Sequence, residues 1–252
     1  MIKESILSSI NPTIPIILAS GSESRKVMLE DAGIKFDVIT SHVDEDILKH
    51  KISSQPFEKQ VIALAAAKAL AVSKQYPDHI VIGGDQMCVW NNQLFDKPGS
   101  AEKAIENLKQ LSGTEHFQHS GICIYKDSKP LWEYSERVTL KMHDLSDEEI
   151  VNYVKLENPI HAAGAYKFES LGCNLFAYVD GSSYTVRGMP LSLITHLRAH
   201  ETVLDLVCRL LLEKKKNKKK LKKIIFSKIT IHSHFTPFNL DIHNLPPSHS
   251  SF

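Results

Sequence analysis

Residues 16–33 read IILASGSESRKVMLEDAG and contain the change of pattern that decides the fold. A short apolar run ends in small hydroxyl residues and a glycine, and an arginine and a lysine follow before the pattern becomes helical. Such a strand-to-helix turn leaves backbone N–H groups free at a helix N-terminus, where anions bind readily. We therefore expect a strand over residues 14–19, a helix over residues 22–32, and an anion, most often a phosphate, at the turn between them.

The residues of this turn are suited to phosphate oxygens. Gly21 allows the backbone to approach an anion closely, and the hydroxyls of Ser20 and Ser22 can donate hydrogen bonds. Arg25 lies one turn into the predicted helix and can form paired hydrogen bonds with a phosphate. The Walker pattern G-x-x-x-x-G-K-[ST] is absent, so the turn is not a P-loop. The alternative is a capped surface helix with solvated charges.

Charge divides the chain into two parts. Residues 1–213 hold 21 Lys and Arg against 28 Asp and Glu, a net charge of −7, whereas residues 214–252 hold nine lysines and one aspartate. An acidic body does not resemble a general nucleic-acid binder. We expect one folded domain over residues 1–213 and a lysine-rich, disordered tail over residues 214–252. A nucleic-acid-binding or membrane-surface arm is the alternative for the tail.

Several sequence features indicate a cytoplasmic protein. No apolar run reaches the roughly 18 residues that a membrane span needs, and the first residues lack a signal-peptide pattern. The four cysteines are far apart, without a C-x-x-C pair, so neither a zinc site nor a dithiol is indicated; they are Cys88, Cys123, Cys173 and Cys208. We expect reduced thiols and no membrane partner. Homodimer formation is left open.

The predicted elements alternate along the chain, which favours an α/β architecture with a mixed sheet. Strands are expected at residues 14–19, 36–40, 80–82, 87–90, 93–95, 121–125, 132–142 and 175–179. Helices are expected at residues 22–32, 57–75, 100–111 and 146–156, and from Pro190 onward. Residues 42–56 are expected to be irregular.

Asp85 follows an apolar segment in residues 79–86, HIVIGGDQ. We interpret the two glycines as the end of a buried strand, which places Asp85 beyond its carboxyl end, where ligands gather in α/β sheets. A carboxylate there can hold a divalent cation or accept a proton. The alternative is a turn aspartate with a local hydrogen bond. If Glu45 or Asp44 faces Asp85, the pair could seat Mg²⁺.

Two lysines have unusual surroundings. Lys68 lies in the small-residue segment LAAAKALA, residues 64–71, and Lys97 lies in FDKP, residues 95–98, just before a predicted helix. Either could contact a triphosphate, and solvated surface lysines are the alternative. The remaining pairs of ligand-type side chains lack a nearby third ligand, and we interpret them as structural; they are His116 with His119 and His196 with His200.

A series of short motifs follows in one order along the chain. They are Leu18-Ala19-Ser20-Gly21-Ser22 with Arg25-Lys26, Val43-Asp44-Glu45, Lys68-Ala69, Ile82-Gly83-Gly84-Asp85-Gln86, Asp96-Lys97-Pro98, Leu111-Ser112-Gly113, Ala163-Gly164-Ala165-Tyr166 and Gly188-Met189-Pro190-Leu191. This series resembles the Maf family of nucleoside triphosphate pyrophosphatases over about residues 14–212. Each motif is weak alone, but the motifs in register are specific.

The resemblance implies an elongated, two-lobed α/β fold of the Maf and ITPase-like type, with a mixed sheet around a central nucleotide cleft. It also implies that water attacks the α-phosphorus of a nucleoside triphosphate, giving a monophosphate and pyrophosphate, with Mg²⁺ or Mn²⁺ as cofactor. The catalytic residues would then be Asp85, Glu45 and Lys68, with Asp85 and Glu45 as metal ligands. The substrate-binding residues would be Ser20, Gly21, Ser22, Arg25 and Lys97.

Three further positions bear on the base. Asp85 is followed by Gln86, and Glu169 follows the Gly-Ala-Tyr motif, a combination that resembles the branch acting on 7-methyl-GTP. A carboxylate at position 169 can accept hydrogen bonds from guanine N1–H and its exocyclic amine. That branch has a tryptophan where this chain has Ser24, so the stacking partner is lost or is supplied by Tyr166, Phe168 or another ring. The alternative is a dTTP or UTP pyrophosphatase.

Three departures from the family pattern concern charge. Glu23 replaces a proline, Lys26 replaces a second arginine, and Asp96 replaces the glycine before Lys97. Each could weaken triphosphate binding, because two add negative charge and one loses a guanidinium fork. They motivate a second hypothesis, a nucleotide-binding regulator of cell division without turnover. A third, a nucleic-acid module, rests on the lysine-rich tail alone.

Overall fold

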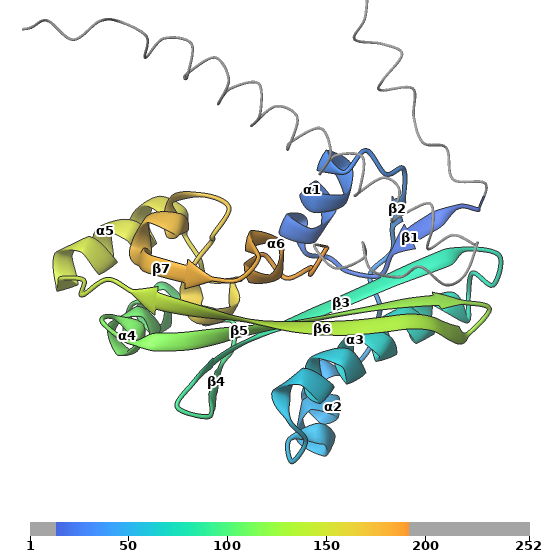
Figure 1. Cartoon of the computed structure of the whole chain (residues 1–252), viewed down its shortest axis with the longest axis horizontal. Helices are drawn as coiled ribbons and strands as arrows, with labels where there is room; N and C mark the ends of the chain where they lie inside the picture. Colours follow the sequence, from blue (N-terminus) through green and yellow to red (C-terminus); the bar gives the residue numbers. More distant parts are fainter. Residues whose placement is uncertain (1–13, 192–252) are drawn as a thin grey trace, which may run out of the picture. The chain divides into compact units, whose positions relative to one another are not determined.

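The computed structural model describes residues 14–191, which form a mixed sheet with flanking helices (Figure 1). The strands are β1 (Ile16–Leu18), β2 (Asp37–Val38), β3 (Ile80–Trp90), β4 (Gln93–Phe95), β5 (Glu115–Lys126), β6 (Lys129–Met142) and β7 (Phe176–Asp180). Their order in the seven-stranded sheet is β2-β1-β3-β5-β6-β7, with β4 paired to β3. β1 is parallel to β2 and β3, and the other pairs are antiparallel. The predicted mixed α/β architecture is confirmed.

The described residues form six α-helices, and three of these begin at a serine where the sequence predicts a helix start. The helices are α1 (Glu23–Asp31), α2 (Glu45–Ile52), α3 (Phe57–Ser73), α4 (Ala101–Leu111), α5 (Asp147–Glu157) and α6 (Ser183–Val186), with 3₁₀ turns η1 (Ala163–Ala165) and η2 (Leu171–Leu175). Ser22, Ser100 and Ser146 cap α1, α4 and α5 through their side chains. Ser146 and Glu149 form a full capping box, which satisfies two backbone N–H groups at the start of α5.

Alternation along the strands separates two faces of the sheet. Ile16 and Leu18 pack in the same apolar cluster as residues of α1, whereas Ile17 and Ala19 pack with residues of α3. Neighbouring residues of a strand point to opposite faces, so each face needs its own cover. We call the side covered by α2 and α3 the α3 face, and the side covered by α1 and α6 the α1 face (Figure 1).

The expectation that β3 ends at the two glycines is wrong, because the strand continues to Trp90. A Cβ atom on Gly83 would lie 2.2 Å from the backbone oxygen of Ala65 in α3, and one on Gly84 would lie 3.1 Å from Arg25 Cδ. The glycines therefore allow close packing on each face rather than a turn. Asp85 consequently lies within the strand and not beyond its end.

The expectation of an irregular segment over residues 42–56 is also wrong, because α2 occupies much of it. The Asp44 side chain accepts a hydrogen bond from the Ile47 N–H at 3.0 Å and so caps the helix. Acidic residues in the first turn and basic residues in the last turn complement the helix dipole. Asp44 is thus a cap, and Glu45 is the member of this acidic cluster that reaches Asp85 through Lys68.

An interruption in strand pairing positions the site. On one side, β3 pairs with β1 at Ile80–Ile82 and with β4 at Cys88–Trp90. Between them, residues 83–87 have no strand partner on that side within the described part of the chain. Asp85 and Gln86 stand in this gap and point to opposite faces of the sheet, since strand side chains alternate.

Some expectations fall outside residues 14–191: the helix from Pro190 onward, the tail over 214–252, Cys208, and the pair His196 and His200. Within the described residues, Cys88, Cys123 and Cys173 are free thiols. His116 and His119 are both buried within β5. No helix in the described segment has the length and apolar character needed to cross a membrane.

Candidate active site

A cleft of about 810 Å³ opens at the gap in β3 pairing and collects the predicted site residues. Every one of them lines this cleft: Ser20, Gly21, Ser22, Ser24, Arg25, Glu45, Lys68, Asp85, Gln86, Lys97 and Glu169. They come from the β1–α1 turn, α1, α2, α3, β3, the β4–α4 loop and the segment after η1. The fold therefore brings together residues spread over about 150 positions of the sequence.

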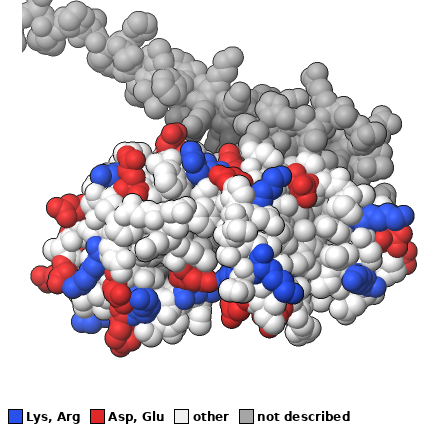
Figure 2. All heavy atoms as spheres, turned by 90° about the horizontal axis from the view of Figure 1, so that it is seen from below, with Lys and Arg blue, Asp and Glu red and all other residues white. Residues whose placement is uncertain are grey.

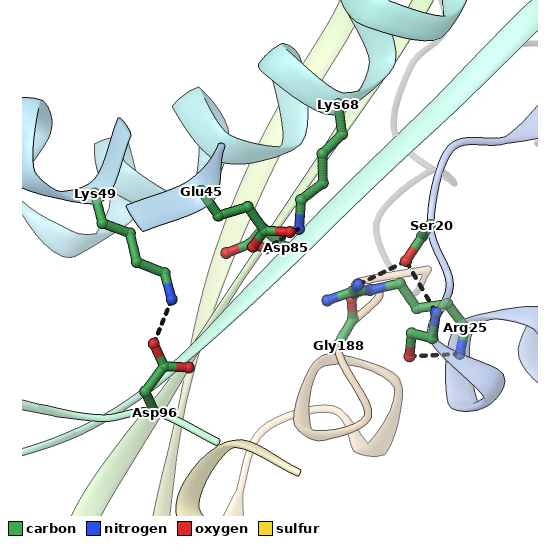
Figure 3. A network of polar contacts seen from close by, with 9 residues as sticks. Ser20, Arg25, Glu45, Lys49, Lys68, Asp85, Asp96 and Gly188 are labelled. Atoms are coloured by element: carbon green, nitrogen blue, oxygen red, sulfur yellow. Dashed lines mark hydrogen bonds and ion pairs between the residues drawn. The ribbon is translucent and has the colours of Figure 1, made fainter. Parts of the chain in front are cut away.

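On the α3 face, one lysine joins two carboxylates. Lys68 Nζ lies 2.6 Å from Asp85 Oδ1 and 3.0 Å from Glu45 Oε1 (Figure 3). The side chains of Lys68 and Asp85 are only 9% and 8% exposed, so their pairing is protected from solvent, whereas Glu45 is 38% exposed. Lys68 thus holds the two carboxylates close to one another at the floor of the cleft.

On the α1 face, Arg25 is buried and held by two oxygen atoms. Its Nε donates to the Gly188 backbone carbonyl at 2.8 Å, and its Nη1 donates to Ser20 Oγ at 3.0 Å (Figure 3). Burial lowers the pKa of Arg25, while the charges of Asp85 and Glu45 act in the opposite direction. A buried guanidinium still carries its charge near neutral pH, so Arg25 is a fixed cation beside the two carboxylates.

The hydroxyls of the β1–α1 turn organise the turn itself. Ser20 Oγ accepts from Arg25 and from the Ser22 N–H, and Ser22 Oγ is the cap of α1. A Cβ atom on Gly21 would lie 3.2 Å from Thr40 Cγ2, so a glycine here also permits close packing of the loop after β2. The turn is therefore built as a rigid strand-to-helix connection that lines the cleft.

Two of the base-specificity candidates are fixed by α6. Gln86 Nε2 donates to the Val186 carbonyl at 2.5 Å, and Ser24 Oγ donates to the Arg187 carbonyl at 3.2 Å. Ser120 Oγ in β5 donates to the Thr185 carbonyl at 2.7 Å and so anchors α6 to the sheet. These bonds place Gln86 and Ser24 at the cleft through backbone groups that are far away in the sequence.

Phe168 and Glu169 follow Tyr166, which is held in place by side chains of β5. Tyr166 is buried, accepts a hydrogen bond from Gln118 Nε2 at 2.6 Å, and lies 3.0 Å from His116 Nε2. Burial lowers the pKa of His116 to about 4, so its ring is neutral near pH 7. Tyr166 is thus a structural anchor, and the half-buried Phe168 remains as an aromatic ring at the cleft beside the exposed Glu169.

Two of the charged departures compensate one another on the surface. Glu23 Oε1 lies 3.4 Å from Lys26 Nζ, one turn apart on α1, and the Glu23 side chain is 74% exposed. Such a pair stabilises a protein by about 0–1 kcal/mol and adds little net field at the cleft. Asp96 likewise pairs with a lysine, Lys49 of α2 (Figure 3).

The cleft also contains residues that the sequence analysis did not single out. They include Lys49, Gln118, His161 and Arg187. The spacing of Glu45 and Lys49, four apart on a helix, would have identified Lys49 once α2 was recognised. Arg187 directly precedes the Gly188-Met189-Pro190-Leu191 motif, which is the signal that could have identified it. No local pattern marks Gln118, which lies in the middle of β5.

The cleft offers two neighbouring carboxylates as ligands for a divalent cation. Within residues 14–191, no group of three or more His, Cys, Asp or Glu side chains could hold a metal ion. Two carboxylates, Glu45 and Asp85, do converge on one cation, the Lys68 ammonium. Mg²⁺ is commonly bound by one or two carboxylates together with substrate phosphates and water, so this pair fits such an ion.

Surface charge on the α3 side of the molecule is mixed. Figure 2 shows lysine and arginine side chains interspersed with aspartate and glutamate over this face, without a continuous basic area among the residues described. A nucleic-acid-binding surface normally gathers positive charge on one face. This face does not have that character.

The family model and the related sequences agree with one another. Residues 15–200 match the model of the family described as Maf-like protein. A nucleoside triphosphate pyrophosphatase of Legionella pneumophila (strain Lens) is 42% identical over 177 residues, which cover 70% of this chain and 88% of that protein. A protein of the same description from Ruegeria pomeroyi is 38% identical over 197 residues, covering 77% and 99%. A solved HAM1 protein structure from Coxiella burnetii has 14% identity and a TM-score of 0.36 over 52% of this chain and 74% of that chain, too low to support a conclusion.

Proposed function

The chain belongs to the Maf family of nucleoside triphosphate pyrophosphatases, and we propose that its substrate is 7-methyl-GTP or a closely similar modified guanosine triphosphate. The observation that carries the proposal is the Glu45–Lys68–Asp85 arrangement in a cleft that also contains Glu169 and Phe168. The Glu45–Lys68–Asp85 arrangement supports the proposed reaction, and Glu169 with Phe168 supports the proposed base. In this role the protein removes modified nucleotides before polymerases use them.

Asp85 is the group that accepts a proton in the proposed reaction. Water attacks the α-phosphorus, the bond from the α-phosphorus to the bridging oxygen breaks, and pyrophosphate leaves. Asp85 takes the proton of the attacking water, and Lys68, 2.6 Å away, keeps its side chain aimed into the cleft. Glu45 balances the Lys68 charge from the opposite side.

Cations of the cleft oppose the negative charge of the triphosphate. Arg25 is held by the Gly188 carbonyl and by Ser20, so it need not reorganise when the substrate arrives. Preorganised charge of this kind is usually the largest contribution to transition-state stabilisation. Lys97 lines the same cleft from the exposed β4–α4 loop and supplies a more mobile charge.

Glu45 and Asp85 are the side chains that would hold a divalent cation such as Mg²⁺ or Mn²⁺. When bound, such an ion polarises phosphoryl oxygens and offsets their charge. The hard oxygen donors of the two carboxylates suit these ions.

Glu169 supports a purine with donors on its Watson–Crick edge. Within the described residues its carboxylate makes no hydrogen bond or ion pair, so its oxygens remain available at the cleft. Guanine presents N1–H and an exocyclic amine to such a group, and a methylated guanine also carries a positive charge that a carboxylate attracts. Phe168 supplies the ring that Ser24 lacks for stacking on the base.

A regulator that binds nucleotide without turnover is the competing function, motivated by Glu23, Lys26 and Asp96. The pairing of Glu23 with Lys26 and of Asp96 with Lys49 reduces the charge penalty that these departures would impose. This favours an enzyme over a binding protein.

The test is pyrophosphate release by the purified protein with Mg²⁺ or Mn²⁺ across 7-methyl-GTP, GTP, UTP, dTTP and CTP. We expect selective turnover of 7-methyl-GTP. In water labelled with ¹⁸O, the label should enter the monophosphate and not the pyrophosphate. Preference for UTP or dTTP would overturn the choice of base but keep the reaction, and binding without turnover of any nucleotide would support the regulator.

A further inference from the structure

A side-chain bridge spans the cleft next to the proposed catalytic carboxylates. Lys49 of α2 pairs with Asp96 of the β4–α4 loop, 47 positions away in the sequence (Figure 3). Both residues line the cleft, and their side chains are 22% and 49% exposed. Neither residue has a role in the reaction as described so far, and Asp96 stands where the family pattern has a glycine.

The Lys49 ammonium belongs electrostatically to the catalytic cluster. Burial alone would lower its pKa, but the hydrogen bond to Asp96 and the charges of Asp96, Asp85 and Glu45 outweigh burial and raise it. Lys49 lies one helical turn after Glu45, on the same side of α2. The Lys49 ammonium is therefore a full positive charge close to Asp85 and Glu45, where the triphosphate would bind.

The groups that contact the Asp96 carboxylate are of the kind that would bind an anionic ligand. It pairs with the Lys49 ammonium, and its Oδ1 accepts the Lys97 backbone N–H at 2.8 Å. Burial would raise the pKa of Asp96, but these hydrogen bonds and the charges of Lys49 and Lys97 lower it. An ammonium group, a backbone amide and a second nearby lysine are also what proteins use to bind phosphate.

We propose that Lys49 is a further phosphate-binding residue of this cleft and that the Asp96 carboxylate competes with the outer phosphates of the substrate for it. This inference rests on the proposed function. A half-exposed ion pair stabilises by only about 0–1 kcal/mol, so a multiply charged phosphate chain can displace the single carboxylate. Asp96 then repels the pyrophosphate that remains after cleavage and favours its release.

The experiment is calorimetric titration of the full-length protein with inorganic tripolyphosphate in buffer containing Mg²⁺. We expect Lys49→Met to weaken binding about tenfold, because a charged hydrogen bond is lost. Asp96→Asn should tighten binding about threefold or more, because a competing anion is removed, and Asp96→Gly should act in the same direction. In the Lys49→Met background, the effect of Asp96→Asn should differ from its effect in the wild type, since the two residues act on one another.

The matched control is an ion pair of similar chemistry away from the cleft. Lys103 and Glu106 of α4 form a 2.8 Å pair and do not line the cleft, so Lys103→Met and Glu106→Gln should leave tripolyphosphate binding unchanged. Thermal unfolding of each variant checks that it is folded. Unchanged or weaker binding by both Asp96 variants overturns the inference, as does additivity in the double variant or a wild-type protein that does not bind tripolyphosphate. Nucleotide turnover by the wild type is measured separately, so the proposed function can stand when this inference fails.

Discussion

Asp85 and Gln86 are neighbours in β3, but their side chains enter two different environments. On the α3 face, Asp85 takes part in ion pairing between side chains: Lys68 with Asp85 and Glu45, and Lys49 with Asp96 nearby. On the α1 face, contacts run from side chains to fixed backbone carbonyls: Arg25 to Gly188, Gln86 to Val186 and Ser24 to Arg187. Charges on the α3 face can be exchanged with a substrate, whereas groups on the α1 face are held in place.

This difference predicts where single substitutions act. Changes on the α3 face should alter the chemical step, because the groups there exchange protons and counter-charges. Changes on the α1 face should alter how the triphosphate and the base are positioned, because Arg25, Gln86 and Ser24 are held there by backbone carbonyls of residues 186–188. The following predictions test whether the two faces differ in this way.

Asp85→Asn is expected to have the largest effect. The amide cannot accept the proton of the attacking water, and Lys68 loses its closer partner, so kcat should fall about 10³-fold. Pyrophosphate release at saturating nucleotide measures this loss. Asp147→Asn is the matched control, because Asp147 of α5 forms an exposed 2.7 Å pair with Lys109 of α4 and does not line the cleft. A kcat near that of the wild type for Asp85→Asn would remove Asp85 from the chemical step.

Alanine substitutions at the two adjacent glycines of β3 should have different effects, one on stability and the other on activity. In Gly83→Ala the new Cβ would meet the backbone oxygen of Ala65 at 2.2 Å, so α3 must shift, and we expect a loss of about 3 kcal/mol in the free energy of unfolding. In Gly84→Ala it would meet Arg25 Cδ and Nε at 3.1 Å, which displaces a side chain but not a helix. Its stability should stay near that of the wild type, and kcat/KM should fall about tenfold.

Urea unfolding and nucleotide turnover, measured on both variants, test whether Gly83→Ala mainly lowers stability and Gly84→Ala mainly lowers kcat/KM. Each variant is the control for the other, because the two substitutions are chemically identical and one position apart. The opposite pattern, with Gly84→Ala unfolded more easily and Gly83→Ala less active, would contradict the assignment of the two faces.

Elements with local signals could be predicted from the sequence. The three serine-capped helices begin as expected, because a cap acts within three residues of itself. The strands expected at residues 87–90 and 93–95 also form, joined by a tight turn with Asn91 and Asn92 at positive φ. The predicted site residues meet in one cleft because motifs in register preserve the order of the elements that carry them.

Features that depend on distant partners could not be predicted. The Gly83-Gly84 pair is locally a turn signal, and only α3 and Arg25, packed on opposite sides, explain why it remains a strand. The bridge from Lys49 to Asp96 and the bond from Arg25 to Gly188 span 47 and 163 positions. The capping role of Asp44 could not be predicted, because it requires a helix that the short, polar sequence of α2 barely indicates.

Glu169→Gln is expected to change the selectivity between bases rather than the rate of the chemical step. A glutamine side chain keeps the shape of glutamate, but an amide NH₂ donor replaces one of the two acceptor oxygens that guanine N1–H and the exocyclic amine would use. The neutral amide also no longer attracts a positively charged methylated base. We expect kcat/KM for 7-methyl-GTP to fall about tenfold, with the rate for UTP unchanged or raised, because an amide can both donate to and accept from uracil.

The measurement is the ratio of kcat/KM for 7-methyl-GTP and UTP in the wild type and in Glu169→Gln. Glu148→Gln on α5 is the control, because its exposed side chain does not line the cleft. An equal fall for both nucleotides would mean that Glu169 acts on the phosphates or on the loop and not on the base. The loop after η1 would then affect the phosphates, as the charged residues of the α3 face do, and the two faces would not have separate roles.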